Sequence, residues 1–206
     1  MQLNEKQIEI LAVAEKLFAE KGFDGTSVRD ISASAEVNVA MISYYFGSKE
    51  KLLEHLILVR VADLKIQLET LFNTNLHPLK KIEKFVDFCI QKIDSNRHLY
   101  KIMHFEMSSQ KRSIDLESFH QVKKENLAIL TKIIEEGQLQ NVFKKNINIE
   151  LITPTIIGTY FHFYINKNYF DGILNFKNDN EFDTYIKNEL TQHLQLTIKS
   201  LLINEN

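Results

Sequence analysis

The sequence predicts an all-α protein of two parts, a three-helix N-terminal domain and a larger C-terminal helical bundle. Through most of the 206 residues apolar side chains recur every three or four positions, which is the period of an amphipathic helix. Only 6 glycines and 2 prolines interrupt the chain, too few for the many turns of an all-β fold. With 44% hydrophobic and 25% charged residues, the composition is that of an ordinary globular protein. We expect the two domains to cover residues 4–64 and 65–206.

The first helix is predicted over residues 4–21. Asn4 is a suitable N-cap because its side chain can accept a hydrogen bond from a free backbone N–H, and Gly22 is a suitable C-terminal stop. The apolar stripe of this helix, which should pack on the next two helices, consists of Ile10, Leu11, Ala14, Leu17 and Phe18.

A helix-turn-helix is predicted at about residues 27–46. Ile31 and Ala35 are four apart on the first short helix, and Ile42 and Phe46 are four apart on the second. Each helix therefore turns one side toward a common core, as the motif requires.

Two helix starts around this motif carry capping residues. Thr26 or Ser27 should cap the first short helix, with Asp30 completing a capping box, and Ser48 should cap a long fourth helix. The N-terminus of a helix carries partial positive charge, so Thr26 and Ser27 act either as caps alone or as caps that also contact a DNA phosphate.

The outer face of the second short helix carries side chains that suit DNA. Amides and hydroxyls can hydrogen-bond base edges or phosphates, and small apolar groups can touch thymine methyls. Asn38 either reads a base or caps the helix, and Tyr45 either packs in the core or contacts a phosphate. Lys49 either pairs with a phosphate or stays solvated, and we expect the former. The predicted DNA-binding residues are Thr26, Ser27, Asn38, Val39, Ala40, Met41, Ser43, Tyr44, Tyr45 and Lys49.

These residues resemble the DNA-binding head of the TetR family of bacterial repressors. The resemblance is carried by TSVRDI at 26–31, AEV at 35–37, SYYFGSKE at 43–50 and the following Leu52-Leu53, and it covers roughly residues 4–64. Two positions depart from the family pattern: Glu36 replaces the usual glycine of the turn, and Ser43 replaces an aromatic residue. The resemblance implies a homodimer on a palindromic operator, with an effector pocket and the dimer interface in the C-terminal domain.

The charge of the head is unusual for a DNA-binding domain. Residues 1–60 carry 7 Lys and Arg against 9 Asp and Glu, whereas neutralisation of phosphates usually needs a basic surplus. Residues 37–48 contain no acid, however, so the surface that would face DNA is neutral. This pattern predicts weak non-specific DNA binding by one head and dependence on the dimer.

The rest of the chain reads as further helices. They are expected at 48–72, 79–94, 98–110, 115–136, 149–168 and 181–203, with a break at 73–78, a helix end at Gly137 and a polar loop at 166–180. Thr153-Pro154 is either a cap with the first helical residue or a kink in a longer helix.

Two functional surfaces are predicted in this C-terminal region. Aromatic, sulfur-containing and histidine side chains are typical of a pocket for a small apolar or aromatic effector, although each of them also suits core packing. The pocket candidates are Phe85, Phe88, Cys89, Tyr100, Met103, His104, Met107, Phe119, Phe161 and His162. The candidates for the dimer interface, for which packing within one chain is the alternative, are Ile157, Tyr160, Phe161, Tyr164, Leu190, Leu194, Ile198 and Leu201.

Several other functions are disfavoured. The seven histidines show no metal-binding spacing, no phosphate loop or serine elbow occurs, and we expect no cofactor, metal or catalytic residue. The lone Cys89 lies in an apolar run, excludes an internal disulfide and agrees with a reducing cytoplasm. No secretory leader and no run of about 20 apolar residues is present, which indicates a soluble protein.

We therefore predict a DNA-binding transcriptional regulator, a homodimeric repressor that a small effector releases from its operator. The alternatives are a helical ligand-binding protein or enzyme with a non-functional DNA-binding head, and a protein-interaction adaptor.

Overall fold

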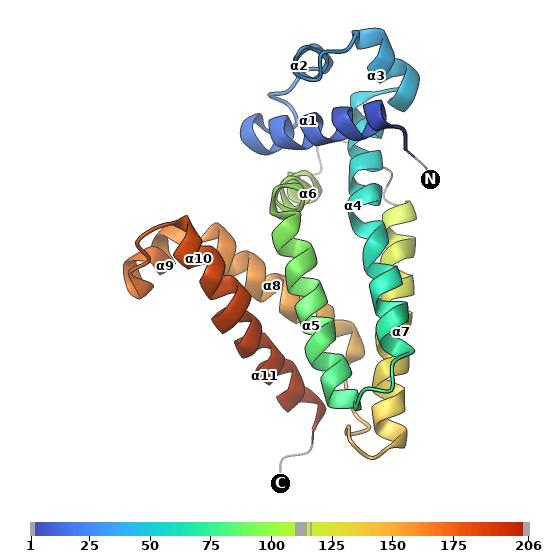
Figure 1. The fold of residues 1–206 in the computed structure, drawn as a ribbon, viewed down its shortest axis with the longest axis vertical. Helices are drawn as coiled ribbons and strands as arrows, with labels where there is room; N and C mark the ends of the chain where they lie inside the picture. Colours follow the sequence, from blue (N-terminus) through green and yellow to red (C-terminus); the bar gives the residue numbers. More distant parts are fainter. Residues whose placement is uncertain (1–2, 110–114, 116, 204–206) are drawn as a thin grey trace. The chain divides into compact units, whose positions relative to one another are not determined.

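A computed structural model describes residues 3–109, 115 and 117–203, in which all regular elements are helices (Figure 1). This confirms the predicted all-α class. The elements are α1 (Glu5–Lys21), α2 (Val28–Ser34), α3 (Val39–Phe46), α4 (Lys49–Phe72), α5 (Pro78–Ser95), α6 (Arg97–Ser109), α7 (Glu117–Leu139), the 3₁₀ turn η1 (Ile149–Leu151), α8 (Ile152–Ile165), α9 (Lys167–Leu174), α10 (Asp179–Tyr185), the π-helical turn η2 (Ile186–Leu190) and α11 (Thr191–Leu202).

The chain forms two compact units. The N-terminal unit contains residues 1–63 together with 96–122, and the C-terminal unit contains residues 64–95 together with 123–206. The first crossing therefore coincides with the boundary expected at residue 64. Residues 96–122, which we had assigned to the C-terminal domain, lie instead in the N-terminal unit.

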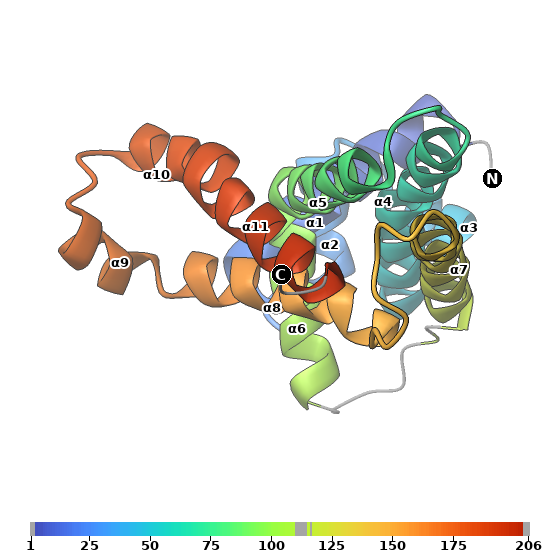
Figure 2. The same ribbon diagram turned by 90° about the horizontal axis from the view of Figure 1, so that it is seen from below.

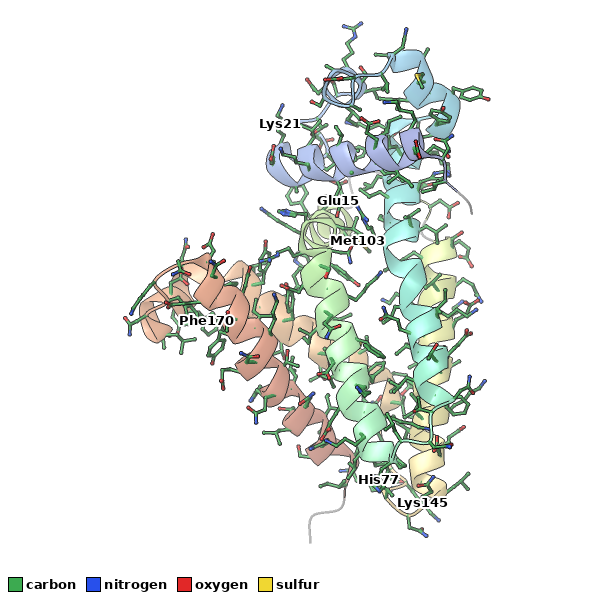
Figure 3. All side chains as sticks on the ribbon, viewed as in Figure 1. Glu15, Lys21, His77, Met103, Lys145 and Phe170 are labelled. Carbon is green, nitrogen blue, oxygen red and sulfur yellow. The ribbon has the colours of Figure 1, made fainter. Side chains whose placement is uncertain are left out.

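The reason is the apolar face of α6, which packs against α1 inside the N-terminal unit (Figure 3, Met103). Leu99, Ile102 and Met103 are all at most 5% exposed and belong to one core cluster with α1, α2, α3 and the first half of α4. The spacing of an apolar stripe predicts burial, but it does not specify which neighbour covers the stripe.

Helices α1 and α4 are also joined by a charged pair. Both Nε and Nη2 of Arg60 donate to Oε2 of Glu15, at 3.0 and 2.7 Å. This contact adds a polar link between two helices of the N-terminal unit whose apolar faces already share a core.

The core of the C-terminal unit lies among α5, α8, α11 and α7, and it contains a buried lysine. Lys81 on α5 is 2% exposed, and its Nζ donates to the carbonyl of Phe72 (2.9 Å) and to Oε2 of Glu136 (2.7 Å). A buried charge is tolerated only when it is paired and hydrogen-bonded. Lys81 therefore fixes the last residue of α4 against α5 and α7.

Helix α9 occupies part of the segment for which we expected a polar loop, and it lies in the connection between α8 and α10 (Figure 2). Lys167 and Asp171 form an (i, i+4) ion pair of 2.9 Å along it. The ring of Phe170 lies 4.5 Å from that of Phe163 on α8, and Phe163 stacks on Phe182 of α10 at 5.2 Å. Aromatic packing thus orders a segment that looks polar in the sequence.

Two further helix boundaries differ from expectation. Gly137 does not end its helix, because α7 continues to Leu139. A Cβ atom at Gly137 would collide with the ring of Phe143, so this glycine permits a close approach. Pro154 is the third residue of α8 and does not kink it, because N–H groups in the first turn have no intrahelical partner.

Candidate nucleic-acid interface

The turn between α2 and α3 is held by caps on both helices. Ser27 is the N-cap of α2, and it forms a capping box with Asp30. These hydrogen bonds from Ser27 lower the pKa of the Asp30 carboxyl. Asn38 is the N-cap of α3, because its Oδ1 accepts from the N–H of Ala40 at 2.9 Å. Glu36 takes the left-handed conformation between the two helices, with φ of 50°.

The helix α3 divides cleanly into a buried and an exposed side. Ile42 and Phe46 are 1% and 3% exposed, as expected for core residues. Tyr44 is 84% exposed and stands out from the unit, while Tyr45 is half-buried with its ring 6.2 Å from that of Phe46. The other exposed or half-buried predicted contacts on this side are Asn38, Val39, Ala40, Met41 and Ser43. One continuous surface therefore carries most of the predicted DNA-binding residues.

Thr26 does not belong to this surface. We predicted it as a cap of α2, alone or with a phosphate contact, but the N-cap is Ser27 and the side chain of Thr26 is buried. It is 0% exposed, and its Oγ1 lies 3.1 Å from the carbonyl oxygen of Leu17 and 2.9 Å from that of Gly22. The hydroxyl fastens the end of α1 to the connector before α2. A threonine next to an N-cap serine gives no sequence signal that separates these two roles.

Lys49 at the start of α4 is engaged inside the unit. Its Nζ donates to the carbonyls of Phe23 and Thr26, each at 2.9 Å, and lies 4.1 Å from the centroid of the Phe23 ring. Two of its three N–H donors are therefore committed to the connector that positions α2. Contact of Lys49 with a phosphate stays a prediction.

Arg29 is a candidate that our sequence reasoning missed. It is exposed on α2, the first helix of the motif, and in helix-turn-helix proteins that helix crosses the DNA backbone. The sequence feature that could have identified Arg29 is its basic side chain directly before Asp30, in the first turn of the helix.

The predicted effector residues are divided between the two units. Phe85 and Cys89 are buried in the core of the C-terminal unit, where Phe88 and Phe161 are half-buried and His162 is exposed.

The other predicted effector residues lie outside that unit. Met103 and Phe119 belong to the core of the N-terminal unit, which also contains the half-buried Tyr100 and the exposed His104. The side chain of Met107 lies outside the described residues. A single pocket built from the whole set inside the C-terminal unit is therefore not what the chain forms, because α6 packs on α1.

Four of the eight residues predicted for the dimer interface are buried in the core of a single chain. Tyr160, Leu190, Leu194 and Ile198 are at most 6% exposed inside the C-terminal unit, so for these four the alternative of internal packing is correct. Ile157, Phe161 and Tyr164 are half-buried, and Leu201 is 45% exposed. The apolar side chains that α8 and α11 expose most are instead Ile165 (58%) and Leu196 (56%), which we did not predict.

A groove of about 460 Å³ opens in the C-terminal unit between α5 and the η2 turn. Its walls are Asp87, Ile90, Gln91, Asp94, Ser95, Lys187 and Thr191. Of the predicted pocket residues with described side chains, none lines it. Burial raises the pKa of the Asp87 carboxyl.

Other chemistry is unsupported in the described residues. They contain no group of three His, Cys, Asp or Glu side chains that could hold a metal, and none of their helices is long and apolar enough to cross a membrane. Burial raises the pKa of the Cys89 thiol to about 12, so this buried cysteine is an inert core residue.

Comparison with known proteins gives matches along most of the chain. A family model described as bacterial regulatory proteins of the tetR family matches residues 10–56, and one described as a tetracyclin repressor-like C-terminal domain matches residues 78–191.

Two relatives and one solved structure extend this similarity. YttP of Bacillus subtilis, named a probable HTH-type transcriptional regulator, is 34% identical over 66% of this chain and 66% of its own length. The HTH-type transcriptional repressor NicS of Pseudomonas putida is 30% identical over 72% of this chain and 70% of its own. The structure of the regulator FadR from Bacillus subtilis in complex with stearoyl-CoA has a TM-score of 0.72 at 19% identity, covering 94% and 97% of the two chains.

Proposed function

Because the chain belongs to the TetR family of bacterial regulators and is a DNA-binding transcriptional regulator rather than an enzyme, we propose that it represses transcription as a homodimer on a palindromic operator. The observation that carries this proposal is the continuous exposed face of α3, which ends in the 84% exposed Tyr44. A monomer would read only a few base pairs, whereas two heads related by a twofold axis read two half-sites about one helical turn apart.

In this proposal the residues of the head have three roles. Val39, Ala40, Met41, Ser43 and Tyr44 face the major groove from α3. Ser27 and Arg29 on α2 face the phosphate backbone, since an N-cap and an exposed guanidinium are both suitable anion contacts. Lys49 holds the connector in place and contributes to binding through the position of α2.

The dimer is proposed to form through the exposed apolar side chains of α8 and α11. TetR-family regulators dimerise, and Ile165 and Leu196 are the most exposed large apolar residues on these two helices. Replacing Leu196 by Glu should convert the dimer to a monomer in analytical ultracentrifugation. The matched control is Ile66→Glu on α4, which changes a similarly exposed residue away from these helices.

The effector is proposed to be a small apolar molecule that binds the C-terminal unit and weakens operator binding. Two observations support this class: the apolar core of the C-terminal unit, to which Phe85 and Cys89 belong, and the stearoyl-CoA bound to a protein of the same fold. An effector can release DNA only if it binds the DNA-incompetent state more tightly. A screen of melting temperature against acyl chains of increasing length tests this, because a ligand that binds only the folded state raises it.

A gel shift tests the DNA-binding role directly. The operator is first selected from random DNA with the full-length protein, and binding is then measured for Tyr44→Ala and for Tyr169→Ala. Tyr169 is a matched control because it is 64% exposed but lies on α9. We expect Tyr44→Ala to weaken operator binding at least tenfold and Tyr169→Ala to leave it unchanged. Failure of the unmodified protein to select any sequence at low salt would refute the proposed function.

A further inference from the structure

The seam between α5 and α11 is a regular ladder of polar pairs. Oε1 of Glu83 on α5 accepts from Nζ of Lys199 on α11 at 2.8 Å. Four residues further along α5, Oδ1 of Asp87 accepts from Nε2 of Gln195, four residues earlier on the C-terminal helix, at 2.6 Å. Because the two helices run antiparallel, moving from one pair to the next advances one turn along α5 and goes back one turn along α11.

The two carboxylates on this ladder differ in their partners. Glu83 is paired with two lysines, Lys199 and Lys80, and these contacts lower its pKa. Asp87 meets a neutral amide where Glu83 meets a lysine. Within the described residues no lysine or arginine nitrogen lies at ion-pairing distance from Asp87, and Lys84 and Lys80 act on it only at longer range. A partly buried carboxylate without a counter-ion is electrostatically unfavourable.

The groove begins at Asp87, the position where the partner on α11 is a neutral glutamine rather than a lysine. One step further, Gln91 falls opposite Thr191. Both of these residues line the groove together with Asp87, Ser95 and Lys187. The C-terminal helix opens there into the π turn η2, and Thr191 Oγ1 satisfies the carbonyl of Ile186 at 2.8 Å. π turns inside α-helices are frequent at functional sites.

We propose that this groove binds a small organic cation of the primary-ammonium class, with Asp87 as its counter-ion. The ligand's ammonium completes the ladder as Lys199 does beside Glu83, and its carbon chain occupies the rest of the groove. A volume of about 460 Å³ is far larger than a bare ion needs and lies in the range of small-molecule sites.

The charges on the other walls are compatible with a cation. Asp94 also lines the groove, but its Oδ1 already accepts from the hydroxyl of Tyr160 at 2.8 Å, so Asp87 alone is assigned as the counter-ion. Lys187 is a cation on the wall that η2 forms. Its repulsion of a bound ammonium is weakened by salt, since the Debye length is about 8 Å at physiological ionic strength.

The test is an NMR titration of the full-length protein at pH 7 with n-butylammonium, 1-butanol and butyrate, three probes of similar size and different charge. The side-chain amide of Gln91 reports on the groove. We expect a saturable shift with n-butylammonium only. Asp87→Asn should raise the Kd at least tenfold, and so should Gln195→Lys, which supplies the missing cation from within the protein. Glu83→Gln, which removes an equal charge one turn away, should leave the Kd unchanged.

Three results would overturn the proposal: equal binding of 1-butanol, unchanged affinity in both Asp87→Asn and Gln195→Lys, or no saturable shift with n-butylammonium. If Asp87→Asn does not fold, Gln195→Lys alone decides, because the lysine it introduces would pair with Asp87 much as Lys199 already pairs with Glu83. Since no DNA enters the measurement, its outcome is independent of operator binding.

Discussion

At the scale of single residues, the head depends on side chains that hold the turn rather than on those that face DNA. Glu36 adopts φ of 50°, a conformation that costs a residue with a Cβ atom roughly 1–2 kcal/mol. Two side chains also hold the connector before α2. The hydroxyl of Thr26 donates to the carbonyls of Leu17 and Gly22. The ammonium of Lys49 donates to the carbonyls of Phe23 and Thr26. These contacts hold the connector that positions α2, the first helix of the motif.

Replacing Glu36 by Gly should therefore stabilise the protein. Glycine removes the Cβ penalty but loses more backbone entropy on folding, which leaves a net gain of about 0.5–1 kcal/mol. Urea denaturation measures the free energy of unfolding. Asn141→Gly is the matched control, because Asn141 has a similar φ of 57° but asparagine tolerates this region better, so its gain should be smaller. A loss of stability in Glu36→Gly would contradict the prediction.

Replacing Lys49 by Met separates its structural role from a phosphate contact. The loss of two hydrogen bonds and of the contact with the Phe23 ring should lower the free energy of unfolding by about 1–3 kcal/mol. If Lys49 only positions α2, the dependence of operator affinity on salt concentration should keep its slope. A lost phosphate contact would instead reduce that slope by about 1.

At the scale of elements, the C-terminal helix is anchored by polar contacts as well as by its apolar face. Glu83 on α5 binds Lys199 on α11 and Lys80 on its own helix, and the pKa of Glu83 falls below its ordinary value of 4.5 as a result. Because the folded state holds this proton less tightly than the unfolded state, the stabilisation is complete above about pH 4.5. It is lost as pH falls through the lowered pKa of the folded state.

Glu83→Gln should consequently reduce the loss of unfolding free energy that the protein shows as the pH is lowered. We expect it to cost no more than about 1 kcal/mol at pH 7, as is usual for pairs near the surface, and nothing at a pH below the folded pKa of Glu83. Urea denaturation from pH 2 to 7 measures the difference. Glu181→Gln is the control, since Glu181 is an exposed carboxylate on α10. An equal effect of Glu83→Gln at every pH would contradict the assignment.

How well the sequence predicted an element depended on how local its determinants are. Caps at Asn4, Ser27 and Asn38 and the core positions Ile42 and Phe46 were correct, because they follow from spacing within a few residues.

The long-range packing was harder to foresee. Tyr160 on α8, and Leu190, Leu194 and Ile198 toward the C-terminus, predict buried faces on their helices. A buried face can be covered equally well by the same chain or by a second copy. Helix α9 does carry apolar residues at helical spacing, Tyr169, Phe170, Ile173 and Leu174, but polar residues flank it on both sides, and its contact with α8 through Phe170 is a tertiary one.

At the scale of the whole molecule, the N-terminal unit is discontinuous in sequence. Its core includes Leu99, Ile102, Met103 and Phe119, which come from residues 96–122 rather than from the first 63 residues. The matched family model of the head covers only residues 10–56, so a part of the folded head lies far beyond that segment.

A fragment of residues 1–64 should therefore lack a cooperative thermal transition, because it leaves one side of its core uncovered. In the full chain, Leu99→Ala should lower the free energy of unfolding by about 2–4 kcal/mol, the usual cost of truncating a buried leucine. Lys101→Ala, on an exposed position of the same helix, should have little effect. Circular dichroism against temperature checks the three, and a sharp transition of the fragment at the temperature of the full chain would contradict the prediction.

The chain passes between its two units at three points, and two of these passages fall inside the continuous helices α4 and α7. Each unit therefore contains segments that are far apart in sequence. No single cut in the chain separates one complete unit from the other, so neither unit can be transferred to another protein as one uninterrupted segment.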